Sequence, residues 1–65
     1  MISLTKLGHQ EFVLNAELIQ TIESTPDTVV TLSSGVKFMV EQPVNEVVRR
    51  VIEYQRSIHG MAAGG

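Results

Sequence analysis

The chain has 65 residues, a formal net charge of −2 and no cysteine. This length gives room for one domain with a small core, and the lack of cysteine excludes disulfide bonds and thiolate metal sites. The few basic residues are interspersed with acidic ones, so the sequence lacks the concentrated basic surface that phosphate binding needs, and nucleic acid is not an expected partner.

The first forty residues are predicted to form strands, because apolar and polar side chains alternate in short segments bounded by turn residues. The segments are residues 2–7, 10–14, 18–24, 28–32 and 36–40. Residues 18–24 also fit a short helix, but the β-branched segment that follows offers a pairing partner and favours a strand. Gly8-His9 suits a two-residue turn with glycine at its first central position. The pattern predicts a five-stranded antiparallel β-meander.

The remaining residues are predicted to form one helix packed on the sheet. Pro43 ends the strands and suits a first helical turn, and the apolar residues after it recur at spacings of three and four. Gly60 is expected to end the helix. We therefore predict an α+β fold in one domain, residues 1–60, with a flexible tail at residues 61–65.

The two faces of the predicted sheet differ in role. One face should receive the helix through Ile2, Leu4, Leu14, Ile22, Val30, Leu32, Phe38 and Val40. The opposite face should carry four further apolar residues, Val13, Ile19, Val29 and Met39. Either they form a second surface for self-association or partner docking, or the sheet coils into a half-barrel and buries some of them. Because exposed apolar patches tend to be functional, these four are interface candidates.

Three helical residues complete the set of interface candidates. Arginine and aromatic side chains often anchor protein interfaces. On this ground we single out Arg50, Tyr54 and Arg56. Tyr54 lies near the edge of the apolar stripe, where it either packs at the rim of the core or contacts a partner.

No pattern in the sequence predicts catalysis, a cofactor or a metal. The acidic residues and the two histidines are spread singly along the chain, and Ser33-Ser34-Gly35 lacks the lysine and helix of a phosphate-binding loop. We therefore expect no catalytic, cofactor-binding or metal-binding residues and no enzyme activity. The apolar runs are far shorter than the roughly 20 residues that span a bilayer, and no signal peptide is visible, so a cytoplasmic protein without membrane insertion is expected.

Several blocks of the sequence resemble one known family. Residues 1–7 open the pattern, and its most specific parts are the blocks Asn15-Ala16-Glu17-Leu18-Ile19 and Thr25-Pro26-Asp27-Thr28. A helix with Glu46-Val47-Val48 and Val51-Ile52-Glu53-Tyr54 completes it. Over residues 1 to about 58 the chain resembles the small flagellar protein family FlbD, also called SwrD. Gly8-His9 departs from the Asn-Gly turn expected there, which affects the turn type only.

The resemblance implies a protein needed for full flagellar motility, in some bacteria by supporting motor power, without catalytic residues. The hypothesis is an oligomeric scaffold that contacts the flagellar motor or its stator units from the cytoplasmic side. The alternative is a post-transcriptional regulator of flagellar genes, because a strand meander with a terminal helix is also similar to the CsrA-type RNA-binding dimers. Those dimers rely on a clustered basic surface, which this chain lacks.

Overall fold

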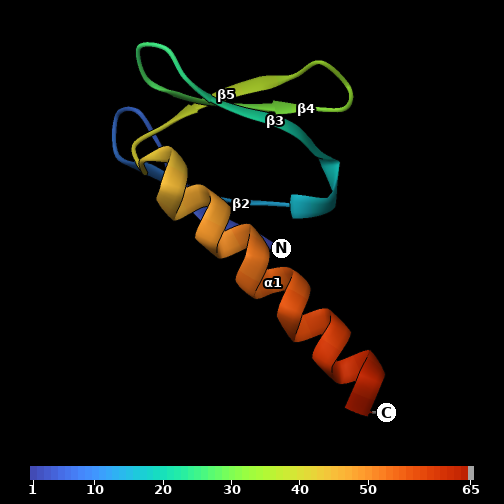
Figure 1. Cartoon of the computed structure of the whole chain (residues 1–65). Helices are drawn as coiled ribbons and strands as arrows, with labels where there is room; N and C mark the ends of the chain where they lie inside the picture. Colours follow the sequence, from blue (N-terminus) through green and yellow to red (C-terminus); the bar gives the residue numbers. More distant parts are fainter. Residues whose placement is uncertain (65) are drawn as a thin grey trace.

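The chain folds into a curved five-stranded antiparallel sheet followed by one long helix (Figure 1). This is a computed structural model that describes the backbone of residues 1–64 and the side chains of residues 1–58. The strands are β1 (Ile2–Lys6), β2 (Gln10–Leu14), β3 (Ile19–Ser24), β4 (Thr28–Leu32) and β5 (Lys37–Val40). A 3-10 helix, η1 (Ala16–Leu18), precedes β3, and helix α1 (Val44–Gly64) follows β5. The α+β class, the five strands and the terminal helix are confirmed.

The order of the strands shows how the sheet curves. A simple meander would pair β2 with β3, but the order is β2-β1-β5-β4-β3, so the first strand pairs with the last and β2 and β3 form the two edges. The β1–β5 junction is short: Lys6 pairs with Val40, and the Glu41 N–H donates to the Thr5 carbonyl at 2.7 Å. The sheet therefore bends towards a barrel without closing into one.

The corner between the two edge strands depends on Asn15. Its side-chain oxygen accepts the N–H of Glu17 at 3.1 Å, and its carbonyl accepts the N–H of Leu18 at 3.0 Å. Such capping is what asparagine offers at a turn, and it stabilises the single turn of η1. Because η1 extends to Leu18, the segment 18–24, which also fitted a short helix, forms a strand only from Ile19 onward.

The placement of Ile19 on the opposite sheet face was wrong. The register between β3 and β4 shifts between Ile19 and Thr21, so Ile19 lies opposite Leu32 and Ile22 lies opposite Val30. A one-residue irregularity reverses the face on which the following side chains lie. Ile19 and Ile22 therefore both pack against the core, although their spacing is odd.

The β1–β2 turn also differs from the expected one. The Lys6 carbonyl accepts the N–H of His9 at 3.1 Å, so the turn spans four residues, with Leu7 and Gly8 at its centre. Gly8 has a φ of 97° and so occupies the second central position, where a type II turn requires positive φ. The difference arises because β1 ends at Lys6, which makes Leu7 part of the turn.

The core lies between the concave face of the sheet and the first half of α1. Its buried hydrophobic residues are Ile2, Leu4, Leu14, Ala16, Val30, Leu32, Val40 and Val47. The residues predicted to receive the helix are all buried here, except that Ile22 and Phe38 are partly buried and pack against the rest. The predicted core face is thus confirmed.

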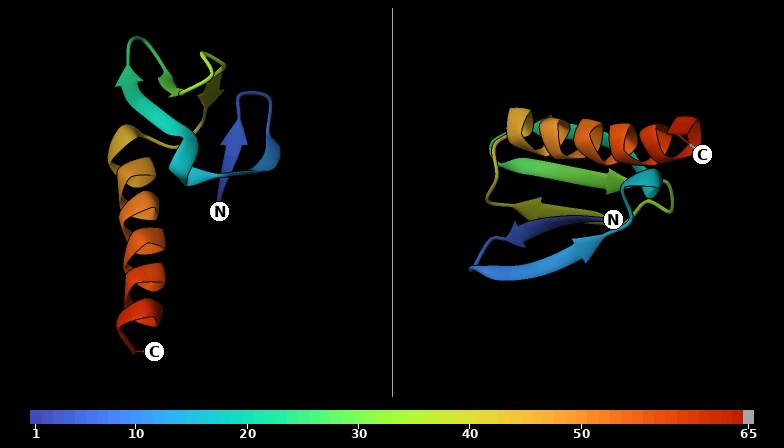
Figure 2. Two further views of the ribbon diagram at one scale, coloured as in Figure 1. Left: turned by 90° about the vertical axis from the view of Figure 1, so that its right-hand side faces the viewer. Right: turned by 90° about the horizontal axis from the view of Figure 1, so that it is seen from below.

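Helix α1 docks through its first turns and then runs past the sheet. Val47 is 0% exposed, and Val51 and Tyr54 continue the same stripe, partly buried against the core. The later turns extend beyond the strands (Figures 1 and 2), which makes the longest extent of the molecule 41 Å against 23 and 18 Å for the other two. The helix is therefore anchored at one end.

The expectation that Gly60 ends the helix was wrong, because the backbone of α1 is helical as far as Gly64. A glycine inside a helix costs about 1 kcal/mol relative to alanine and can be tolerated. The predicted flexible tail, residues 61–65, lies outside the residues whose side chains the structure describes.

Candidate interaction surfaces

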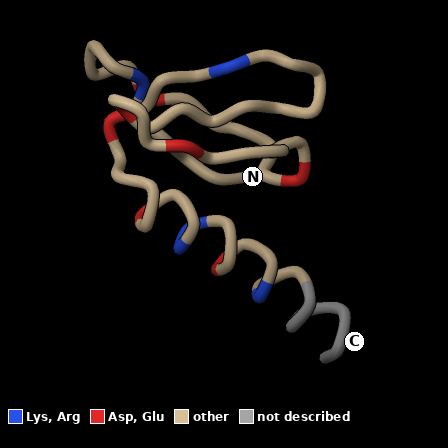
Figure 3. Tube along the Cα trace, turned by 45° about the horizontal axis from the view of Figure 1, so that its top comes forward, with Lys and Arg blue, Asp and Glu red and all other residues tan. Residues whose placement is uncertain are grey.

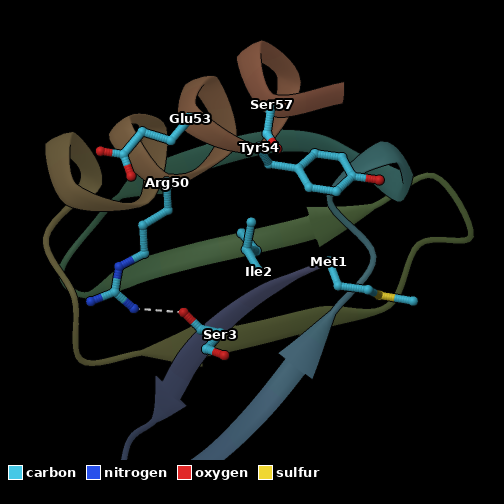
Figure 4. Close-up of a pocket in the computed structure, with 7 residues that line it drawn as sticks. All are labelled: Met1, Ile2, Ser3, Arg50, Glu53, Tyr54 and Ser57. Carbon is cyan, nitrogen blue, oxygen red and sulfur yellow. Dashed lines mark hydrogen bonds between the residues drawn. The ribbon is translucent and has the colours of Figure 1, made fainter. Parts of the chain in front are cut away.

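Arg50 ties helix α1 to the first strand. Its Nη1 donates to the carbonyl oxygen of Ser3 at 2.6 Å (Figure 4), and its Nε donates to Glu46 Oε2 at 2.8 Å. Strand β5 ends at Val40, opposite Lys6, so the first half of β1 has no strand on that side. The guanidinium therefore occupies the place of a missing strand partner.

Gln42 makes a similar contact two residues further along β1, at Thr5. The Thr5 N–H donates to Gln42 Oε1 at 2.9 Å, and Gln42 Nε2 donates to Thr5 Oγ1 at 3.0 Å. A side-chain amide carries the same donor and acceptor as a peptide group. The side chain of Gln42 thus extends the β1–β5 ladder beyond the end of β5.

A cleft of about 430 Å³ opens beside this junction, between the start of β1 and the middle of α1 (Figure 4). It is lined by Met1, Ile2, Ser3, Arg50, Glu53, Tyr54 and Ser57. The cleft brings together two of the predicted interface residues, Arg50 and Tyr54. Tyr54 is also partly buried against the core, so it packs at the core rim, which was the first of its two interpretations.

Acidic and basic residues follow one another along α1 (Figure 3), and those on its polar side form a network of ion pairs. Arg49 donates from Nε to Glu46 Oε1 at 3.0 Å and also pairs with Glu53. The hydrogen bonds from Arg49, and next those from Arg50, lower the pKa of Glu46 to about 2, and the same contact with Glu46 raises the pKa of Arg49. Glu46 is therefore ionised at neutral pH and unsuited to donate a proton. Arg56 is exposed and has no ion pair with any residue of known side-chain position.

The convex face of the sheet carries an apolar row that runs from the β1–β2 turn across β5 to β4. Val29 pairs with Met39, which is 51% exposed, and the Leu7 N–H donates to the Met39 carbonyl at 3.2 Å. Leu7 is itself 46% exposed. We call Leu7, Met39 and Val29 the convex row. Leu7 was missed as a candidate because its place beside Met39 depends on the β1–β5 pairing, for which local periodicity gives no signal.

Val13 lies apart from the convex row. It pairs with Ser3 at the far end of β1 and, at 65%, is among the most exposed apolar residues. The predicted patch of four therefore divides: Val29 and Met39 are neighbours, Val13 lies at the edge strand β2, and Ile19 faces the core.

Two further polar side chains, Lys6 and His9, contact neighbouring side chains. Lys6 Nζ lies 5.2 Å from the ring centres of both Phe12 and Phe38, a cation–π arrangement between two rings whose centres are 5.0 Å apart. His9 Nδ1 lies 2.9 Å from Glu41 Oε2, which also accepts the His9 N–H at 3.1 Å. Within residues 1–58, no three histidine, cysteine or acidic side chains gather where they could hold a metal. No helix in the described part of the chain is long and apolar enough to cross a membrane.

The sequence was compared with models of known protein families. A model of the FlbD family, described as flagellar and swarming motility proteins, matches residues 1–59. The chain belongs to the FlbD family. The match includes all five strands and the part of α1 that packs on the sheet. The resemblance to the FlbD family that the sequence indicated is therefore confirmed. Comparison with curated proteins and with solved structures found no match.

Proposed function

We propose that this FlbD protein is a non-enzymatic accessory of bacterial flagellar motility that supports the motor or its stator units through protein–protein contacts. Membership of a family of flagellar and swarming motility proteins carries the general role. The contact with motor or stator proteins, on the cytoplasmic side of the motor, is the finer part of the proposal.

The convex row supports a contact function. Leu7, in the β1–β2 turn, and Met39, on β5, each expose about half of their surface, next to Val29. The helix occupies the concave face, so within residues 1–58 this row is an apolar sheet surface still open to a partner. Apolar area removed from water is worth roughly 25 cal/mol per Å², which makes such a row a suitable contact.

The charges of the chain argue against the RNA-binding alternative. Arg49 pairs with Glu46 and Glu53, Arg50 pairs with Glu46, and Lys6 lies against two phenylalanine rings. A basic surface that displaces counterions from phosphates needs such groups clustered and free. Protein contact is therefore the better supported function.

The test is complementation of a deletion strain, with swimming speed measured under rising viscous load and filaments counted in the same cells. Met39→Glu places a charge in the convex row and should lower speed under load while filaments stay normal. Ser34→Glu, which adds the same charge at an exposed residue in the loop between β4 and β5, is the matched control and should complement fully.

Three results would contradict the proposal. If Met39→Glu restored full speed at high load, the convex row would not be the contact surface. If the deletion removed the filaments, the protein would act in assembly or gene expression. Salt-sensitive RNA binding by the purified chain would then favour the regulatory alternative.

A further inference from the structure

Strand β2 leaves one edge of the sheet open. In the strand order β2 is the outermost strand on its side, and Figure 2 shows no other element beyond it in the view from below. The opposite edge, β3, has an irregular register and packs against α1. An irregularity and a covering helix are two common ways in which proteins protect a sheet edge. Among the residues that the structure describes, β2 is thus the regular and uncovered edge of the two.

The pairing of β1 shows which backbone groups this edge presents. Ser3, Thr5 and Leu7 use their backbone groups on the β5 side, towards Arg50, Gln42 and Met39. Because successive residues of a strand point their backbone groups to opposite sides, Ile2, Leu4 and Lys6 bond to their partners on β2. Within β2 the groups that point away from β1 are thus the N–H and C=O of Glu11 and Val13.

We propose that β2 is a self-association edge, at which β2 of a second copy of this chain pairs antiparallel and joins two sheets into one. The register sets Phe12 opposite the partner's Phe12, and Glu11 opposite the partner's Val13. Every outward N–H and C=O of Glu11 and Val13 then gains a partner across the two-fold axis.

Charge and exposure select this occupant and this register. Glu11 is the one charged residue of β2, and β2 has neither the proline nor the lysine that often blocks edge pairing. A register that set Glu11 opposite the partner's Glu11 would bring like charges together, whereas the proposed one sets each Glu11 beside an apolar residue. It also covers Val13, which is 65% exposed in the single chain, and pairs Phe12 with a second aromatic ring.

The test compares two charges at one position, using the purified full chain. Wild type should sediment as a dimer at micromolar concentration. In the Val13→Glu dimer, the new glutamate of each copy lies opposite Glu11 of the other copy, so like charges meet at two places. This should raise the dissociation constant roughly tenfold or more. Val13→Lys faces the same Glu11 with the opposite charge and should remain dimeric.

A third variant tests the backbone. Val13→Pro removes an N–H that points away from β1, so it should leave the far-ultraviolet circular dichroism unchanged and yield a monomer. Met39→Glu, on the convex row, is the control and should keep the wild-type mass.

Each other outcome overturns the proposal. A wild-type monomer throughout the micromolar range removes the self-association edge. Equal weakening by Val13→Glu and Val13→Lys indicates another register or a purely apolar contact. A dimer that persists in Val13→Pro places the interface elsewhere.

Discussion

Replacing Val47 by alanine should measure how strongly α1 holds the sheet. Val47 is 0% exposed at the centre of the helix–sheet contact. The change removes two methyl groups, each worth about 1 kcal/mol when buried, and alanine returns about 0.5 kcal/mol through its better helix propensity. The expected loss is about 1.5–2 kcal/mol, a large part of the roughly 3–10 kcal/mol expected for a chain of this length. In a thermal melt this corresponds to a decrease in Tm of about 6–16 °C.

The adjacent residue provides the matched control. Val48 lies on the same helix, is 38% exposed and gains the same helix propensity on substitution. Val48→Ala should therefore leave the free energy of unfolding within about 0.5 kcal/mol of wild type. Urea unfolding followed by circular dichroism at one protein concentration compares the two. Equal losses in Val47→Ala and Val48→Ala would refute the reasoning, since burial against the sheet is what distinguishes the two sites.

Further predictions concern the polar contacts. The folded pKa of Glu46, about 2, lies below its ordinary value of 4.5, so its contribution to stability is complete above pH 4.5 and is lost as the pH falls towards 2. In Glu46→Gln, the free energy of unfolding should therefore depend less on pH over that interval than in wild type. Gln42→Ala should cost about 1–2 kcal/mol in urea unfolding, because the Thr5 N–H loses its acceptor, whereas Gln20→Ala, at an exposed position, should be neutral. Arg50→Lys should weaken the β1–α1 contact and speed amide exchange at the start of β1, because an ammonium cannot reproduce the guanidinium fork; unchanged exchange would count against this role.

Local patterns were sufficient to predict most of the fold. The strands and the core face follow from alternation, which depends only on neighbouring residues, and the docked stripe of α1 follows from its spacing of three and four. The placement of Val29 and Met39 on one face was right for the same reason. The position of Tyr54 at the core rim also followed from the helical spacing.

Pairings between distant segments were harder to predict. The join of β1 to β5 has no local signal, so neither Leu7 in the convex row nor the edge position of β2 could be foreseen. Ile19 was misplaced because a register shift has no reliable mark in the sequence. Arg50 was named as an interface anchor, but its contact with Ser3 depends on where β5 stops.

The β1–β5 junction links the sheet to the docking of α1. Few main-chain bonds join the two halves of the sheet, and side chains from the segment after β5 complete the join: Glu41 holds the β1–β2 turn, Gln42 holds Thr5, and Arg50 holds Ser3. The contact of Arg50 with Ser3 requires α1 to be docked, because Arg50 is on the helix, whereas Gln42 lies just before it. The same docking leaves the convex row and the β2 edge facing away from the helix. Folding of α1 therefore completes the sheet and sets the orientation of both proposed contact surfaces.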